Sequence, residues 1–475
     1  MTGAAESGTD YLVVGAGAMG MAFTDVLLAE TEATVTIVDR HAQPGGHWND
    51  AYPFVRLHQP SSFYGVNSRP LGEDTVDETG WNRGLYELAS GAEVVAYFDQ
   101  VMNRQFLPSG RVRYLPMCRY EGEGRARSLV SGERFDVGDH HKTVDATYMN
   151  VTVPSTTPPS YEIAPGCRCV PPNGLIGLAD LAGSVPVERY VVIGAGKTGI
   201  DACLWLLAMG VEPDHITWIM PRDSWLLDRA NLQPGPEFID ETLEAATRQM
   251  EIGAEADSVD ALFAGLEAEG LLLRLDPAVR PTMYRCATVT RAELEQLRRI
   301  RDVVRLGRVR RIEQDRLLLD DGEVLTVEGT LYVDCTADGL ARRPVVPVFA
   351  GDRLTLQTVR TCQQVFSAAF IGHIEAAYGH LDDAARNELC TVVPHPENEL
   401  DWLRTTIATT LNGGRWRADP DLDRWLGAAR LDGFSQARSG DGLAPSRLEI
   451  LARLRQSVPA AVTNLTRLLE TAEQS

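Results

Sequence analysis

The sequence has very little lysine and a clear deficit of positive charge. Only Lys142 and Lys197 are lysines among the 475 residues, and 45 Lys and Arg stand against 66 Asp and Glu, for a net charge of −21. A protein that binds nucleic acid or an anionic membrane through a basic face needs the opposite balance. The composition therefore argues against nucleic acids and membrane surfaces as partners.

Two further absences concern targeting. No stretch of about 18 consecutive apolar residues occurs, so the sequence predicts no membrane-spanning helix. The first ten residues carry neither the basic region nor the apolar region of a secretory signal peptide. We therefore expect a cytoplasmic protein.

The cysteines form no local pair of the kind that holds a metal or performs redox chemistry. The eight cysteines are spread along the chain without CxxC or CxxxxC spacing, and Cys167 and Cys169 are the only close pair. A zinc cluster or a flavin disulfide reductase needs such spacing. We expect reduced thiols, no disulfide framework and no metal site, since His140 and His141 also lack a metal-ligand spacing.

What is present is an ordinary globular composition with a repeated motif. Hydrophobic residues make up 44% of the chain and charged residues 23%, which is typical of a folded protein with a sizeable core. Residues 11–28 and 190–207 share one design: a β-branched apolar run, a glycine-rich turn and a helical apolar pattern. Its two occurrences predict an α/β fold with two dinucleotide-binding Rossmann-like domains.

The first glycine-rich turn has the spacing GxGxxG, with Gly15, Gly17 and Gly20. In such a turn the first glycine permits the tight bend, the second the approach of a pyrophosphate, and the third close packing of helix on strand. The helix that follows directs its positive end toward the phosphates. Asp39 ends the next apolar run at about 20 residues' distance, where an acid hydrogen-bonds a ribose hydroxyl.

The second turn repeats this spacing with Gly194, Gly196 and Gly199, and it encloses Lys197 and Thr198. The Gly-Lys-Thr run looks like an ATPase phosphate loop. That loop needs another glycine five positions before the first residue of the run, and an apolar strand residue stands there instead. The second turn is therefore interpreted as a dinucleotide turn.

Arg222 ends the apolar run after the second turn, where a fold that binds NAD would carry an acid. An arginine there suits the 2′-phosphate of NADPH. The alternative is a solvated arginine, because nearly every basic residue of this chain is arginine. Two dinucleotide units in one chain indicate FAD together with NADPH.

A more specific pattern follows the first unit. Asp39 is followed by GGHW, which ends at Trp48, and residues 52–64 are YPFVRLHQPSSFY. This order resembles the flavin-dependent (FAD- and NADPH-dependent, class B) monooxygenase superfamily, including its N-hydroxylating and Baeyer–Villiger branches. The resemblance extends over residues 15–64 and 190–222 and less closely over 304–339, and it does not include the C-terminal region.

The resemblance implies an activity and a set of site residues. In this superfamily, flavin reduced by NADPH reacts with dioxygen to give a C4a-(hydro)peroxide, which oxygenates a small-molecule substrate, here expected from secondary metabolism. Catalytic roles at the flavin edge or the substrate fall on Arg56, His58 and Gln59. Cofactor-binding roles fall on the two turns and on residues that follow them: Gly15, Gly17, Ala18, Met19, Gly20, Asp39, Arg40, Gly46, His47, Trp48, Ser62, Cys118, Gly194, Gly196, Lys197, Thr198, Gly199, Arg222 and Ala337.

The sequence departs from the superfamily at two places. The fingerprint FxGxxxHxxx(Y/F/W), which normally precedes the second turn, is absent, and residues 166–180 contain no histidine. His58 takes the position of the Baeyer–Villiger aspartate. Two alternatives therefore stay open: a flavin-dependent oxidase or dehydrogenase without a stable peroxyflavin, and a non-catalytic nucleotide-binding redox sensor.

The order of the motifs predicts the domain organisation. We expect an FAD-binding domain over 1–165, an inserted NAD(P)-binding domain over 186–325, and an FAD-domain return strand with a helical C-terminal region over 326–475. The patterns predict strands at 110–118, 143–153 and 329–339, helices at 237–250, 259–269 and from 290, a hairpin over 316–325, and a late helix from Ser446 that Pro459 interrupts. Amphipathic helices near the C-terminus permit a homodimer.

Overall fold

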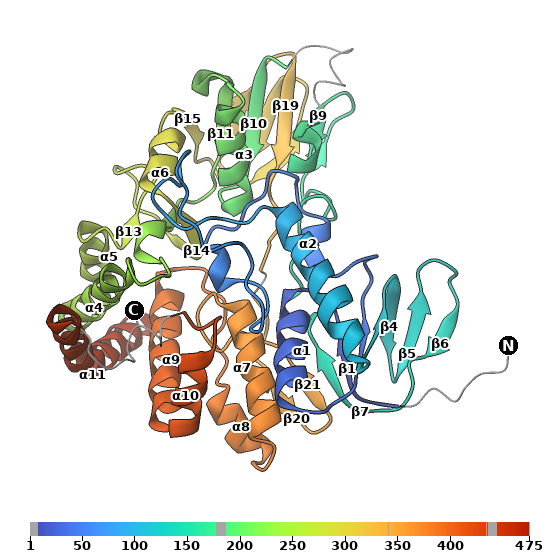
Figure 1. Ribbon diagram of the computed structural model, residues 1–475. Helices are drawn as coiled ribbons and strands as arrows, with labels where there is room; N and C mark the ends of the chain where they lie inside the picture. The colour runs from blue at the N-terminus through green and yellow to red at the C-terminus, as the bar shows by residue number, and fades with distance from the viewer. Residues whose placement is uncertain (1–7, 177–186, 341, 434, 436–443, 475) are drawn as a thin grey trace.

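The computed structural model describes residues 8–176, 187–340, 342–433, 435 and 444–474. Two separate parallel sheets organise the molecule (Figure 1). The first sheet consists, in spatial order, of β20 (Phe349–Ala350), β21 (Arg353–Thr355), β7 (His140–Asp145), β1 (Thr9–Val14), β2 (Val35–Val38) and β3 (Val112–Leu115). Its neighbouring strands are parallel except for β20 and β21.

The second sheet repeats the central arrangement of the first. It consists, in spatial order, of β15 (Asp302–Val304), β11 (Ile216–Ile219), β10 (Arg189–Ile193), β19 (Thr330–Asp334) and β9 (Arg168–Val170), all parallel. β1 and β10 each lie between two parallel neighbours, and α1 (Ala18–Glu30) and α3 (Lys197–Ala208) begin directly after the turns that follow them. The predicted pair of Rossmann-like units is confirmed.

The strand predicted to return to the first sheet belongs to the second sheet, so that prediction is wrong. β19 pairs with β10, with Val192 opposite Val333, and all its residues are buried. The chain instead returns to the first sheet through β21, which pairs with β7. In both sheets a buried strand rich in β-branched residues can pair with the central strand. The local sequence of β19 therefore does not indicate which sheet it joins.

Two other predicted strands are shorter than expected. The strand over 143–153 is present only as β7, because the chain then turns, with Asn150 at a φ of +42°. The strand over 110–118 is present as β3, because Gly110 bends the chain before it and Pro116 follows it. The predicted hairpin is confirmed as β17 (Arg316–Leu319) and β18 (Gly322–Leu325).

Helices cover the sheets. The segment of chain that connects β11 to β15 forms a separate lobe, which includes several of them. The predicted helices are confirmed as α4 (Ile239–Glu255), α5 (Val259–Ala268) and α6 (Arg291–Leu297), and α6 begins with the capping box of Thr290 and Glu293. The others are α2 (Gly91–Val101), α7 (Gln364–Ala377), α8 (Asp383–Leu389), α9 (Glu399–Ala418), α10 (Pro420–Ala428) and α11 (Pro445–Glu473). α7 packs on α1, and α11 packs on α4 and α9 (Figure 1).

Pro459 does not interrupt α11, so that prediction is wrong as well. The proline lies inside a continuous helix of 29 residues. A proline leaves the carbonyl four residues earlier, here that of Arg455, without its helical hydrogen bond. Both residues are exposed, so water can satisfy that carbonyl and the helix continues.

The lobe contains β12 (Ser224–Asp228), β13 (Leu272–Leu273) and β14 (Met283–Val289). The remaining strands are β4 (Cys118–Gly122), β5 (Arg125–Ser128), β6 (Arg134–Asp136), β8 (Glu162–Ile163) and β16 (Val309–Ile312). Cys286 of β14 forms a disulfide with Cys362, 76 residues later, so the expectation of reduced thiols is wrong for this pair. Local spacing carries no signal for so distant a partner.

In the part of the chain that the structure describes, no helix combines the length and the apolar character that a bilayer crossing requires.

Candidate nucleotide and substrate site

The first glycine-rich turn joins β1 to α1 and is closely packed. Gly15 has a φ of +106°, and a side chain on Gly20 would overlap the carbonyl oxygen of Gly15. Both positions therefore require glycine for steric reasons. α1 begins at Ala18, and its second residue, Met19, is buried. Because the helix starts directly after the turn, its N-terminal amides and positive dipole face the turn.

The Gly-Gly segment near Trp48 lies directly on this first turn. The Gly45 amide donates a hydrogen bond to the carbonyl of Ala16 at 2.9 Å. A Cβ on Gly46 would lie 2.9 Å from Cα of Gly17, which is too close for any side chain. The second glycine of the motif therefore makes room for another segment of this chain, a contact that the GxGxxG spacing alone does not indicate.

Aromatic side chains extend from that contact. Nε1 of Trp48 donates a hydrogen bond to the Tyr64 hydroxyl at 2.7 Å, and the two rings meet edge to face with centroids 5.8 Å apart. The His47 ring lies beside Trp48 at 5.3 Å. Burial lowers the pKa of His47 to about 4, so its imidazole is neutral at pH 7. The three side chains form an uncharged aromatic cluster.

Asp39 is held at the end of β2 by the first turn and by His41. Its carboxylate accepts hydrogen bonds from the Ala16 amide at 2.6 Å and from the His41 amide at 2.7 Å. Nδ1 of His41 lies 2.9 Å from the same carboxylate, and this hydrogen bond raises the pKa of His41. Arg40 points to solvent. The Cys118 amide bonds to the Asp39 carbonyl at 2.8 Å, while its side chain is buried in a small core beside Leu12.

The second glycine-rich turn has the same backbone form and a more open surface. Gly194 has a φ of +125°, and a side chain on Gly199 would overlap the Gly194 carbonyl oxygen. Around Gly196, by contrast, no atom of the described residues lies within 4 Å of a Cβ placed there. Gly196 is also exposed, so this turn offers its second glycine to an incoming ligand.

Lys197 connects the second turn to the first domain. Its ammonium donates a hydrogen bond to the carbonyl of Arg56 at 3.0 Å and forms an ion pair with Asp201 one helical turn later. The Tyr52 hydroxyl donates to the same Asp201 carboxylate at 2.6 Å, and the Thr198 hydroxyl adjoins Tyr52. Burial raises the pKa of Asp201. Segment 52–62 of the first domain is thereby tied to the start of α3.

The three residues predicted to be catalytic lie on that segment and differ in how far they are exposed. The Arg56 side chain is exposed and donates to the Leu88 carbonyl at 3.2 Å. His58 and Gln59 are half-buried. Nδ1 of His58 and Oγ of Ser62 are buried without a hydrogen-bond partner among the described residues. Such orphaned atoms are uncommon in native proteins and are available to a ligand.

Burial, together with nearby positive charge, keeps the His58 ring neutral. Burial, followed by Lys197, Arg229 and His395, lowers its pKa to about 3. A neutral imidazole with a free Nδ1 can accept or donate one hydrogen bond, depending on its tautomer. The acidic position that the resemblance assigns here is therefore filled by an uncharged group.

Arg229 is a site residue that the sequence did not indicate. It is 2% exposed, and its guanidinium donates to the His58 carbonyl at 3.0 Å and forms an ion pair with Glu293 at 3.0 Å. It also donates to Asn82 at 3.0 Å. Arg229 thus joins the segment of His58 to the lobe, and only the folded chain brings these partners together.

The remaining predicted residues lie at the second sheet. Arg222 is exposed just after β11, and no hydrogen bond or ion pair to it is found within the described residues. Ala337 follows β19 and is half-buried. Because β19 belongs to the second sheet, Ala337 lies near the second turn, and its cofactor-binding role stays a prediction.

Comparisons with known proteins agree with this arrangement. A family model described as an NAD(P)-binding Rossmann-like domain matches residues 13–59. The uncharacterized protein Rv2000 of Mycobacterium tuberculosis is 58% identical over 424 residues, which cover 89% of this chain and 77% of that protein. The uncharacterized protein Mb2023 of Mycobacterium bovis matches to the same extent.

A solved structure shares the fold. The open crystal structure of cyclohexanone monooxygenase matches 81% of this chain and 92% of its own chain, with 14% sequence identity and a TM-score of 0.51. The chain therefore belongs to the same family as the two mycobacterial proteins, and it has the fold of cyclohexanone monooxygenase, with two dinucleotide-binding units.

Proposed function

We propose that this protein is an FAD- and NADPH-dependent oxidoreductase, and that its activity is the monooxygenation of a small-molecule substrate. The observation that carries the proposal is the link between the second glycine-rich turn and segment 52–62 of the first domain. Lys197 of the second turn bonds to the Arg56 carbonyl at 3.0 Å, and Tyr52 bonds to Asp201 at 2.6 Å. Two nucleotides on these turns would meet at segment 52–62, as hydride transfer from nicotinamide to flavin requires.

The residues present fit the two nucleotides in different ways. FAD suits the first turn, where the amides at the start of α1 face its pyrophosphate and Asp39 keeps unused acceptor capacity for a ribose hydroxyl. NADPH suits the second turn, where Gly196 is open and the exposed Arg222 can reach a 2′-phosphate. The fold of cyclohexanone monooxygenase supports the same assignment.

When bound, the two nucleotides would supply hydride transfer and, with dioxygen, the transfer of an oxygen atom to the substrate. The chain itself would orient them and exclude water. The Trp48 ring, held by its hydrogen bond to Tyr64, supplies an aromatic surface, and the orphaned Nδ1 of His58 supplies one hydrogen bond. The buried Arg229 holds the His58 backbone in place.

A direct test uses the full chain reconstituted with FAD. Under anaerobic conditions, NADPH should bleach the flavin absorbance, and NADH should do so more slowly. In air with ¹⁸O₂, probe substrates such as a cyclic ketone, a thioether and a primary amine should yield one labelled product. The proposal would be refuted if the protein retained no FAD, or if its bound flavin stayed oxidised after NADPH was added.

A second candidate is a flavin-dependent oxidase or dehydrogenase, and one observation favours it. His58 is neutral where the resembling Baeyer–Villiger enzymes place an acid, and the fingerprint histidine is absent. This candidate predicts that each NADPH consumed yields hydrogen peroxide in air and that no probe incorporates ¹⁸O. The ratio of peroxide to labelled product separates the two activities in one reaction.

A further inference from the structure

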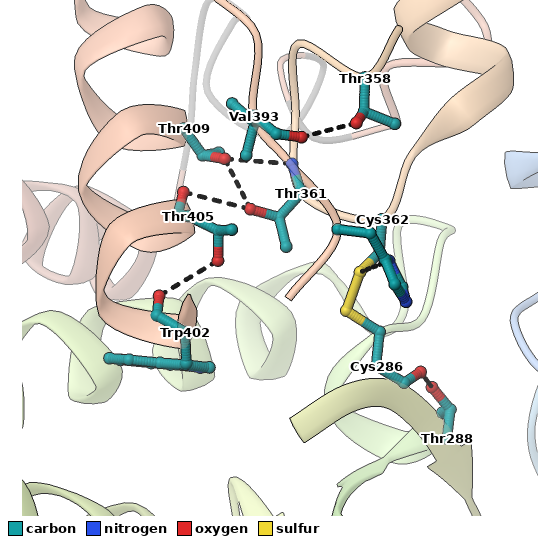
Figure 2. Close-up of a disulfide and its surroundings, with 10 residues drawn as sticks. Cys286, Thr288, Thr358, Thr361, Cys362, Val393, Trp402, Thr405 and Thr409 are labelled. Atoms are coloured by element: carbon teal, nitrogen blue, oxygen red, sulfur yellow. Dashed lines mark hydrogen bonds between the residues drawn. A yellow bond between two sulfur atoms is a disulfide. The ribbon is translucent and has the colours of Figure 1, made fainter. Parts of the chain in front are cut away.

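The disulfide between Cys286 and Cys362 joins two distant parts of the chain (Figure 2). Cys286 lies on β14 in the lobe, and Cys362 lies in the turn just before α7. Their Cα atoms are 6.6 Å apart. The mechanism proposed above uses neither cysteine, so the pair needs an explanation of its own.

Both half-cystines have an unusual backbone. Cys286 has a φ of +55° and Cys362 a φ of +56°, in the left-handed region that non-glycine residues seldom occupy. At Cys286 the ladder between β12 and β14 also shifts register. Backbone strain of this kind occurs preferentially at functional sites and persists only when surrounding contacts enforce it.

The surrounding contacts hold the Cys362 turn without help from the sulfur bridge. The Thr361 amide donates to the Thr409 hydroxyl at 3.1 Å, and the Thr361 hydroxyl donates to the Thr405 carbonyl at 3.2 Å (Figure 2). Both partners are on α9. The turn therefore keeps its position if the disulfide opens.

Cys286 is held in the same manner. The Arg285 guanidinium donates to the carbonyls of Asp338 and Leu340, each at 3.0 Å. The Thr288 hydroxyl donates to the Cys286 carbonyl at 3.2 Å. Because each cysteine is positioned by its neighbours, two thiols would stay close enough to re-form the bond.

The two sulfur atoms differ in access and in partners. Cys286 is buried at 7% exposure, while Cys362 is half-buried. Nδ1 of His395 lies 3.8 Å from the Cys362 sulfur. Burial, with a smaller effect from Arg285, lowers the pKa of His395 to about 4, so the ring is neutral and can accept a hydrogen bond from a thiol.

We propose that Cys286 and Cys362 form a thiol–disulfide exchange site that low-molecular-weight thiols open while the fold stays intact. A thiolate attacks the accessible Cys362 sulfur, the disulfide breaks, and Cys286 leaves as a thiolate that takes a proton. A second thiol attacks the mixed disulfide and releases Cys362. In total, two thiols become one disulfide, and two electrons and two protons pass to the cysteine pair.

The alternative is a structural staple, since a bridge across 76 residues restricts the unfolded chain. The interface that the bridge crosses, however, already has an apolar core. Trp225 and Phe263 of the lobe pack there with Trp402 of α9. The two parts hold together through that core, so a staple is not required for their contact.

The first experiment maps the reactivity of the cysteines in the folded full chain. Without reductant, iodoacetamide should label neither Cys286 nor Cys362. After native incubation with millimolar glutathione it should label both, and glutathione disulfide should then restore their protection. The buried Cys203 and Cys335 should stay unlabelled throughout, and so report that the fold is intact. Labelling without reductant, or only after denaturation, would overturn the proposal.

The second experiment tests the order of attack with single variants. Incubated with glutathione disulfide, which a free cysteine attacks with release of one glutathione, Cys286→Ser should form a glutathione adduct at Cys362 at least about 10-fold faster than Cys362→Ser forms one at Cys286. His395→Phe should slow the adduct at Cys362, and His395→Asn, which keeps a polar atom near the Nδ1 position, should restore it. Equal rates in the two serine variants, or the same rate in both His395 variants, would contradict the proposed site. No nucleotide is needed, so the result is independent of the proposed oxidoreductase activity.

Discussion

The two glycine-rich turns have one spacing and two different surroundings. The first is covered by another segment of the chain, since Gly46 lies against Gly17, and its acid Asp39 is already hydrogen-bonded. The second has open space around Gly196, and Arg222, which follows the neighbouring strand β11, is exposed. The motif therefore determines the shape of the backbone, while its neighbours determine how enclosed a ligand becomes. The enclosed turn suits a resident nucleotide and the open turn one that exchanges.

The largest effect should come from replacing Gly20, which is tightly packed in the first turn, whereas replacing Gly196, which is open in the second, should have little effect. Gly20→Ala puts a Cβ into the Gly15 carbonyl and should lower the free energy of unfolding by about 3 kcal/mol. Gly196→Ala meets open space and should change it by less than about 0.5 kcal/mol. Urea unfolding measures both. Equal destabilisation would mean that Gly20 is no more tightly packed than Gly196.

Next in size is the acid of the first turn. Asp39→Asn should weaken FAD binding by about 2 kcal/mol, or about 30-fold, because a charged acceptor becomes neutral. The dissociation constant follows from quenching of flavin fluorescence. Asp50→Asn, which changes the other partner of His41, serves as the control. If NADPH binding falls as much as FAD binding, the two turns do not serve separate nucleotides.

Two histidines of the first domain, His41 and His58, should make stability depend on pH with opposite sign. His41 has a raised pKa beside Asp39, so its stabilisation is complete below about 6.5 and is lost as the pH rises through its folded pKa. His58, with a pKa lowered to about 3, makes the unfolded state bind more protons, so stability falls as the pH drops below about 6.5. The ring is half-buried, so we expect the loss to be about 2 kcal/mol.

Two variants separate these effects in unfolding midpoints measured from pH 4.5 to 8.5. His41→Gln should flatten the alkaline side of the profile only, and His58→Asn the acidic side only. Identical profiles for both variants would show that the two histidines do not differ in their electrostatic surroundings.

The smallest effect concerns Arg222. Arg222→Ala should raise KM for NADPH about 5-fold, equivalent to about 1 kcal/mol, and leave KM for NADH unchanged, because only NADPH carries the 2′-phosphate. Arg119→Ala removes an exposed arginine of β4, in a different sheet, and is the matched control. An equal change in KM for NADPH and NADH would show that Arg222 does not bind the 2′-phosphate.

The central strands, both turns and the capping box could be predicted because each depends on a few adjacent residues. The sheet that β19 joins could not, because both sheets accept the same apolar pattern. The partners of Arg229 come from three distant segments, so no spacing indicates them. The disulfide of Cys286 and Cys362 was missed for the same reason. Pro459 was misjudged because exposure decides its cost, and exposure is a property of the packed helix.

The packing of α11 on α4 also has a consequence for synthesis of the chain. Arg453 of α11 bonds to Glu244 and Glu251 of α4, more than 200 residues earlier, and Leu451 packs on Leu243. At about 5–20 residues per second, α4 leaves the ribosome about 10–40 s before its partner exists. During that interval α4 lacks its contacts with α11, so the lobe completes its folding only once α11 has been made.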